Sequence, residues 1–596
     1  MVYTGSDAGD HASAPQPSGS GSVPASVNVP GLVVAAVWAV GLVAGLVALT
    51  IGHLAVAAAA LVVAVMAPWC RVGPISRMAN IGSAAKRCAG RPPVKRPHSQ
   101  PAGAVCDFRR GSAGPHLREP MVLRSLASPA ALTDPKRCAS VVGVAAFAVR
   151  REHAPDALGG PPGLPAPRGF RAAFAAAYAV AYLAGGERRM LRLIRRYGPI
   201  MTMPILSLGD VAIVSDSALA KEVFTAPTDV LLGGEGVGPA AAIYGSGSMF
   251  VQEEPEHLRR RKLLTPPLHG AALDRYVPII ENSTRAAMHT WPVDRPFAML
   301  TVARSLMLDV IVKVIFGVDD PEEVRRLGRP FERLLNLGVS EQLTVRYALR
   351  RLGALRVWPA RARANTEIDD VVMALIAQRR ADPRLGERHD VLSLLVSARG
   401  ESGEQLSDSE IRDDLITLVL AGHETTATTL AWAFDLLLHH PDALRRVRAE
   451  AVGGGEAFTT AVINETLRVR PPAPLTARVA AQPLTIGGYR VEAGTRIVVH
   501  IIAINRSAEV YEHPHEFRPE RFLGTRPQTY AWVPFGGGVK RCLGANFSMR
   551  ELITVLHVLL REGEFTAVDD EPERIVRRSI MLVPRRGTRV RFRPAR

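Results

Sequence analysis

Cysteine is scarce in this chain of 596 residues. The five cysteines are Cys70, Cys88, Cys106, Cys138 and Cys542, so none occurs between residues 139 and 541. This gap excludes a disulfide framework in most of the protein and indicates a reducing compartment. The four early cysteines show neither C-x-x-C spacing nor paired histidines, and they therefore do not predict a zinc or iron–sulfur site.

Basic residues are missing from residues 1–30, which are rich in serine, glycine, proline and alanine. A secretory signal peptide begins with basic residues, so this composition instead predicts a disordered tail. Formal charge of either sign is then absent from residues 31–67. As one helix this run would be roughly 56 Å long, against about 30 Å for the hydrocarbon core of a membrane. We predict a transmembrane segment or hairpin at residues 31–68, with a buried pair of core helices as the alternative.

Basic residues follow in excess, because residues 71–124 contain 11 Lys and Arg against two Asp and Glu. This asymmetry predicts that the chain beyond the hydrophobic run is cytoplasmic. No zinc-finger spacing or RNA-binding aromatic motif accompanies the basic residues, so nucleic acid is not an expected partner. Residues 69–158 lack a helical or strand period and predict a flexible basic linker. A start codon assigned too early, with Met121 or a later residue as the true start, would also explain this composition.

From residue 159 to residue 596 the pattern becomes that of a folded domain. Most of this region has helical periodicity, while strand-like stretches occur at 201–216, 484–503 and 575–593. No internal repeat of the solenoid type is present. The sequence therefore predicts a mainly α domain with a small β subdomain.

The segment FGGGVKRCLG, residues 535–544, precedes a helical run at 545–563. Its glycines let the backbone turn tightly and pass close to a flat ligand. Cys542 lies just before the helix N-terminus, where backbone N–H groups lower the pKa of a thiol and favour the thiolate. The segment therefore predicts a thiolate available to a metal.

A second segment, AGHETT at residues 421–426, lies within a helix predicted at 408–440, which begins with a capping box of Ser407 and Glu410. Glycine weakens the middle of a helix, and a threonine hydroxyl can bond to a carbonyl one turn earlier. Together Gly422 and the threonines favour a local distortion that would open a pocket for a small molecule.

These segments resemble the cytochrome P450 superfamily, the haem-thiolate monooxygenases, over residues 160–596. In that family the matching cysteine binds the iron of haem b, which implies Cys542 as the axial metal ligand. The resemblance also assigns Phe535, Gly536 and Gly544 to the haem-binding loop. Lys540 stands where the family usually has arginine or histidine, and it offers a haem propionate a charge without the planar fork of arginine.

The same resemblance implies roles for residues outside this loop. Thr425 and Glu424 are the implied catalytic pair, because the threonine steadies activated oxygen and the acid supplies protons. His257 and Arg261 fit the family's Trp/His-x-x-x-Arg helix, and with Arg478 they are implied partners of the haem propionates.

A further match is structural rather than catalytic. Glu465 and Arg468, followed by Arg521 in FRPERF, resemble the family's Glu-Arg-Arg folding network. An acid–base pair of this spacing on a helix surface contributes only about 0.5 kcal/mol, so the pair alone would indicate nothing.

The implied activity is that of a haem-dependent monooxygenase, which inserts one oxygen atom from O2 into an apolar organic substrate. No flavin, nicotinamide or cluster motif is present outside the domain, so electrons would come from an external partner. Bacterial members of the family imply a ferredoxin with a ferredoxin reductase, and basic residues could supply a complementary face. The candidates for that face are Arg259, Arg260, Lys262, Arg445 and Arg446.

Apolar residues at positions that resemble the family's pocket wall indicate a lipid, sterol or terpenoid-like substrate. They are Ile243, Met249, Phe250, Pro474, Leu475, Ile580 and Met581. Two alternatives stay open. One is a peroxide-using or isomerase-type haem-thiolate enzyme, and the other is a membrane-tethered haem sensor or binding protein.

Overall fold

The structure is a computed structural model that describes residues 159–163, 186–205, 208–238, 241–338, 340, 358–401 and 403–595. The predicted tail, membrane segment and linker lie outside these residues and stay predictions. Within the described residues, one helical stretch at 538–562 has the length and hydropathy of a membrane span, and 67% of it is buried inside the fold. A core helix of a folded domain has the same properties.

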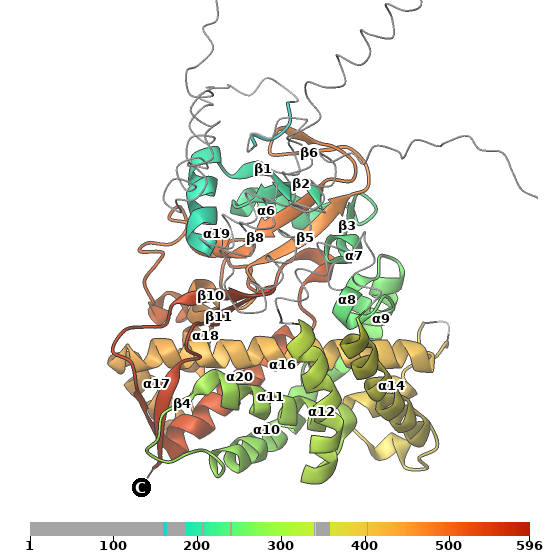
Figure 1. Cartoon of the computed structure of the whole chain (residues 1–596), viewed down its shortest axis with the longest axis vertical. Coiled ribbons are helices and arrows are strands. Elements are labelled where there is room, and N and C mark those ends of the chain that lie inside the picture. Colours follow the sequence, from blue (N-terminus) through green and yellow to red (C-terminus); the bar gives the residue numbers. More distant parts are fainter. Residues whose placement is uncertain are drawn as a thin grey trace, which may run out of the picture. The chain divides into compact units, whose positions relative to one another are not determined.

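A five-stranded sheet is the largest sheet in the described part of the domain and lies beside a larger layer of helices (Figure 1). Strands β2 and β8 are parallel, and the other neighbouring strands are antiparallel. In sheet order the strands are β1 (Ile200–Ile205), β2 (Gly209–Val214), β8 (Arg496–His500), β5 (Leu475–Ala480) and β3 (Leu231–Leu232). The expected strands near residues 201–216 and 484–503 are confirmed, except that the second stretch becomes helical after His500.

Three smaller sheets complete the β structure. They are β6 (Leu484–Ile486) with β7 (Tyr489–Val491), β10 (Ile575–Arg578) with β11 (Met581–Pro584), and β4 (Phe297–Ala298), β12 (Arg589–Pro594) and β9 (Gly563–Ala567) in that order. All their pairings are antiparallel. The domain is therefore mainly α with a small β part, as the sequence predicts.

The helices occupy most of the described chain. They are α6 (Ser217–Thr225), α7 (Gly233–Gly236), α8 (Ala241–Tyr244), α9 (Glu256–Leu264), α10 (Ala272–Met288), α11 (Met299–Phe316), α12 (Pro321–Gly338), α14 (Pro359–Arg380), α15 (Val391–Ser397), α16 (Asp408–Leu438), α17 (Pro441–Gly453), α18 (Ala457–Val469), α19 (Ile501–Asn505) and α20 (Ala545–Glu562). Residues 186–197, before β1, are also helical.

Helix α16 crosses the helical layer and is roughly 46 Å long (Figure 1). Its predicted capping box is present, since the Glu410 N–H donates to Ser407 Oγ and the Ser407 N–H donates to a Glu410 carboxylate oxygen. The helix ends two residues before the predicted end at His440, and the rings of His439 and His440 contact carbonyls of its last turn.

The expected distortion at Gly422 is not present, because α16 is a continuous α-helix through this position. The expected hydroxyl bonds do form, since Thr425 Oγ1 donates to the Ala421 carbonyl at 2.7 Å and Thr426 Oγ1 to the Gly422 carbonyl at 2.6 Å. Close packing explains why the helix stays regular. A Cβ on Gly422 would lie 3.3 Å from Cδ1 of Ile311 on α11, so the glycine brings the two helices together.

The predicted Glu-Arg-Arg network joins α18 to the segment that precedes the cysteine loop. The fully buried Arg468 donates to Glu465 through Nε at 2.6 Å and Nη2 at 2.8 Å, and Arg521 Nε donates to the same carboxylate at 3.1 Å. The remaining donor capacity of Arg468 goes to the carbonyls of Asn505, Pro514 and Glu516. The pair is therefore a buried structural joint, not a surface pair.

Candidate functional site

The segment that contains Cys542 folds as a tight loop in front of α20. The Cys542 N–H donates to the Phe535 carbonyl at 2.9 Å, which closes the loop on itself. Gly536 has a φ of +67° and Gly538 a φ of +65°, a backbone conformation that side chains disfavour. A Cβ on Gly538 would also lie 2.2 Å from the carbonyl oxygen of Phe224, so α6 and the loop meet backbone to backbone.

The side chain of Cys542 is accessible and lies among charged neighbours. Protein nevertheless surrounds it so closely that burial raises its pKa. The Gly544 N–H and the charges of Arg541 and Arg261 oppose the effect of burial and stabilise a thiolate. A metal cation would complete the ionisation, because a coordinating thiol loses its proton.

Arg478 lies beside this loop and is buried without a carboxylate partner among the described residues. It donates to the carbonyls of Ala477 and Gly537, and its guanidinium lies 5.6 Å from the ring centroid of Phe224. Burial lowers its pKa to about 10, although the charge of Glu253 opposes this. A buried guanidinium that has only carbonyl acceptors fits an anionic ligand such as a haem propionate.

The other predicted basic partners reach the same region from two elements. Lys540 Nζ donates to the Gln252 carbonyl, and burial lowers its pKa to about 8 against the charges of Glu253 and Glu254. His257 is buried on α9, and its Nδ1 lies 2.8 Å from Glu254 Oε1. Burial lowers the pKa of His257 as well.

A small pocket lies between Arg478 and Lys540. Arg478 and Lys540 line it together with Phe224, Glu253 and Glu254. Arg261 lies on the cysteine side instead, because its Nη1 donates to the Arg541 carbonyl at 2.8 Å. Burial lowers the pKa of Arg261, and the charge of Cys542 opposes this effect. The residues present therefore fit haem, with a thiolate for the iron and buried cations for the propionates.

The predicted catalytic acid, Glu424, is buried in α16 and paired with Arg304 of α11. Arg304 Nε donates to Glu424 Oε1 at 3.1 Å, and its Nη2 contacts the same oxygen. Burial raises the pKa of Glu424, while Arg304 and then Arg578 pull it down. Glu424 is thus a buried acid with a cationic partner, a suitable arrangement for holding and releasing a proton.

Neighbouring side chains place apolar segments beside this acid. Burial together with the charge of Glu424 raises the pKa of Tyr244 to about 12, so this ring lies near the acid. The Tyr244 and Phe250 ring centroids are 5.3 Å apart. The charge of Arg578 also lowers the pKa of Glu424. Arg578 is paired with Met581 at the turn between β10 and β11, so this turn lies in the same region.

The seven predicted pocket-wall residues separate into two groups. Ile243, Met249, Pro474 and Met581 are buried in the core. Phe250, Leu475 and Ile580 are large apolar side chains that are 39%, 40% and 54% exposed. Only this second group has the open apolar surface that a substrate pocket needs.

Three residues of this region could not be selected from the sequence. Arg304 contacts Glu424 across 120 positions, and its only signal is a charge in the mostly apolar run MLTVARSLMLDVIV, which also contains Asp309. Phe224, which supports the glycines of the cysteine loop, lies more than 300 positions before them. Glu551 of α20 lies beside Thr426; burial raises its pKa to about 8, and its Oε2 has no hydrogen-bond partner in the described structure.

The predicted basic face is wrong for Arg260. This side chain is only 2% exposed and forms an ion pair with the buried Asp414. It therefore lies inside the fold and cannot meet a partner protein. The sequence misplaced it because the run of basic residues at 259–262 looks like a solvated helix face, whereas a helix turns each successive side chain by about 100°.

The other four cations do not share one face. Arg259 contacts Glu410 at the start of α16, and Lys262 pairs with Glu401. Arg445 and Arg446 are on α17, which begins after the far end of α16, as Figure 1 shows. Each of the four also has a carboxylate partner already.

Comparison with known proteins gives consistent matches. The family model described as Cytochrome P450 matches residues 180–592. The chain is 36% identical over 424 residues to cytochrome P450 135B1 of Mycobacterium tuberculosis, which covers 70% of this chain and 89% of that protein. It is 35% identical over 440 residues to cytochrome P450 138 of the same organism, covering 73% of this chain and 97% of that protein.

Among solved structures, the chain resembles the retinoic acid-bound cyanobacterial CYP120A1. The TM-score is 0.61 with 22% sequence identity, and the match covers 74% of this chain and all of that chain. At this identity the likeness concerns the fold. It supports the arrangement of helices and sheets around the cysteine loop.

Proposed function

The chain belongs to the cytochrome P450 family of haem-thiolate monooxygenases, and from this premise we propose that it oxidises a lipid, sterol or terpenoid-like substrate with Cys542 as the iron ligand. The observation that carries the proposal is the placement of Cys542. Its thiol is accessible, receives the Gly544 N–H, and lies in a loop that also presents Lys540. Bound haem supplies the oxygen activation and the redox chemistry.

The residues of the chain then have distinct tasks. Arg478, Lys540 and His257 would hold the carboxylates of the cofactor, and the Gly544 N–H together with the charge of Arg541 would stabilise the sulfur as thiolate. Glu424 holds a proton at its carboxylate, and Arg304 sets how firmly it is held. Thr425 presents a hydroxyl whose own proton goes to the Ala421 carbonyl, so its oxygen lone pairs are available as acceptors.

An oxygenase of this kind is expected to depend on the Thr425 hydroxyl. Replacing Thr425 by valine keeps the shape of the side chain but removes the hydroxyl, so product formation with an external electron donor should fall by about tenfold to a hundredfold. The measurement is product formed per electron consumed. The control is Thr429→Val one turn later, whose hydroxyl donates to the Thr425 carbonyl, and it should stay near wild type.

Two outcomes would contradict this expectation. Full product yield per electron in Thr425→Val would show that the hydroxyl is not needed. Undiminished turnover of Thr425→Val with peroxide alone would instead favour the peroxide-using alternative.

For the electron donor we propose an acidic ferredoxin that docks near the cysteine loop. Lys262 is 55% exposed on α9, and the exposed Arg541 lies next to Cys542. The contact between Arg261 and the Arg541 carbonyl keeps these two cations on adjoining segments. Complementary charge would increase the association rate and make it sensitive to salt.

Reversing the charge of Lys262 is expected to slow reduction. Lys262→Glu should weaken ferredoxin-dependent reduction by roughly threefold to tenfold at low salt and reduce its salt dependence. The matched control is Arg445→Glu on α17, at the other end of α16, which should have no such effect. Equal reduction rates in both variants, or an equal loss in both, would refute the docking site.

A further inference from the structure

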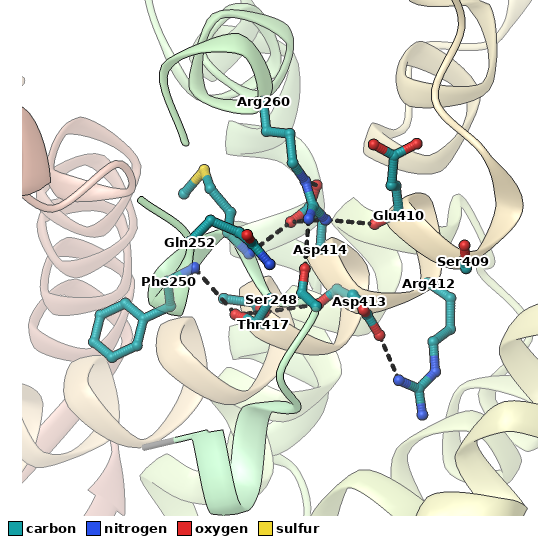
Figure 2. Close-up of polar contacts among 12 residues, drawn as sticks. Ser248, Phe250, Gln252, Arg260, Ser409, Glu410, Arg412, Asp413, Asp414 and Thr417 are labelled. Atoms are coloured by element: carbon teal, nitrogen blue, oxygen red, sulfur yellow. Dashed lines mark hydrogen bonds and ion pairs between the residues drawn. The ribbon is translucent and has the colours of Figure 1, made fainter. Parts of the chain in front are cut away.

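Residues 246–252, between α8 and α9, form a loop that rests on the first turns of α16. This docking loop contains Gly247, Ser248, Met249 and Phe250. Figure 2 shows its polar contacts with α16 and α9. A Cβ on Gly247 would lie 1.8 Å from Asp413 Oδ2, so the loop backbone lies directly against the helix.

A buried ion pair fastens the docking loop to both helices. Arg260 of α9 donates through Nε to Asp414 Oδ2 at 2.9 Å, and its Nη2 lies 2.7 Å from Asp414 Oδ1. The two side chains are 3% and 0% exposed. The Met249 N–H donates to Asp414 Oδ1 at 3.3 Å, and Arg260 Nη1 donates to the Gly247 carbonyl.

The same guanidinium also holds the start of α16. Arg260 Nη2 donates to the Glu410 carbonyl at 2.9 Å. Arg260 therefore joins the docking loop, α9 and the start of α16. Breaking any of these contacts would leave a buried polar group without its hydrogen-bond partner. Loss of one member of such a pair is costly, because the remaining charge stays buried without compensation.

A second contact fixes the orientation of the loop. Ser248 Oγ and Thr417 Oγ1 are 2.7 Å apart and buried. The Phe250 N–H donates to the same Ser248 oxygen at 3.1 Å. The pair of hydroxyls thus connects α16 to the backbone of Phe250.

One apolar side chain of the docking loop, that of Phe250, has open surface and lies beside Tyr244. Phe250 is 39% exposed, and its ring lies against Tyr244, the residue near Glu424. The buried contacts therefore decide where the exposed surface of Phe250 stands relative to the acid.

We propose that Asp414 and Arg260 are positioning residues for the substrate, which lock the docking loop to α16 and α9 and so set the size of the apolar molecule that reaches the Glu424–Thr425 turn. This role rests on the proposed function, because only an enzyme of that kind has a substrate to position. The locking itself depends only on the contacts described. It gives the buried Arg260 a structural role, whereas the sequence had placed this residue on a basic face for the redox partner.

The first test measures backbone hydrogen exchange of the full-length protein over residues 244–252. Asp414→Asn weakens the acceptor of the Met249 N–H, and Thr417→Val removes the partner of Ser248 Oγ, which accepts from the Phe250 N–H. Exchange of these amides should become roughly tenfold faster or more. Thr417→Val keeps the shape of the side chain and leaves no buried charge, so it serves if Asp414→Asn folds poorly. The control is Asp408→Asn, which removes an exposed carboxylate from the first turn of α16.

The second test measures selection by size. Imidazole and the bulkier phenylimidazole are titrated against the haem protein, and the Soret shift gives the dissociation constant of each. In both loop variants the dissociation constant of phenylimidazole, divided by that of imidazole, should fall by at least about threefold. In Asp408→Asn this ratio should stay unchanged.

The two readouts separate the possible failures. Unchanged exchange at residues 244–252 in both loop variants would overturn the locking. Faster exchange with an unchanged ligand ratio would overturn the role in selection. Failure of the proposed function would appear differently, as a wild-type protein without a thiolate haem spectrum, and the exchange test would still decide whether the loop is locked.

Discussion

Cys542→Ser is expected to abolish the red-shifted Soret band of the reduced, carbon monoxide-bound protein. Serine keeps the size of the side chain but its hydroxyl stays protonated at neutral pH, so it cannot donate electron density to iron as a thiolate does. The loop should survive the change, because the Cys542 backbone N–H, not its sulfur, closes the loop at Phe535. Monooxygenase turnover should fall by at least about a hundredfold, more than the loss of a group that only supports a ligand.

The measurement is the difference spectrum of the reduced protein with and without carbon monoxide, together with haem content. A matched control is Cys138→Ser, which makes the same replacement at a cysteine outside the predicted domain. The control should keep the band. A serine variant at 542 that retains the band would show that another residue binds the iron, and the assignment would be wrong.

Glu465→Ala is expected to cost about 3–5 kcal/mol in the free energy of unfolding, because it leaves the buried charge of Arg468 without its counter-ion. Glu465 accepts two bonds from Arg468, one from Arg521 and one from the Arg518 N–H, so a single change unpairs several buried donors. Arg468→Lys should be nearly as damaging. Lysine lacks the fork that reaches the carboxylate and the carbonyls of Asn505 and Pro514 together.

Urea unfolding measures the effect, and haem content reports whether the cysteine loop still forms. The control is Glu520→Ala, which removes the partner of Arg446 from a pair that is 46% and 58% exposed. Its effect should stay within about 1 kcal/mol. If Glu465→Ala is as mild as this control, the network is not a buried joint.

Local features of this protein can be derived from its sequence. The tight turns at Gly536 and Gly538, the helix after Cys542 and the capping box at Ser407 each depend on residues within about ten positions of one another. In such cases the residue types dictate the backbone conformation with little help from the rest of the chain. The sequence therefore predicted the helix that follows the cysteine loop and the capped start of the long helix α16.

Long-range packing explains where the prediction failed. Gly422 was expected to distort α16, but the close approach of Ile311 keeps the helix regular. Arg260 was expected on the surface because its neighbours are basic. Its burial depends on Asp414, which lies 154 positions later.

The sequence by itself determined the chemistry of this protein, which is a cysteine in a glycine-rich loop, an acid and a threonine on one helix, and basic residues suited to propionates. Tertiary structure decided which of these groups meet. Arg304 reached Glu424 only because the apolar faces of α11 and α16 pack together, and Arg260 reached Asp414 because the fold places α9 near the first turns of α16. Burial then strengthened the attraction within those ion pairs, at the cost of desolvating both charges, and raised the pKa of Glu424; burial is a property of the whole fold that no short stretch of sequence contains.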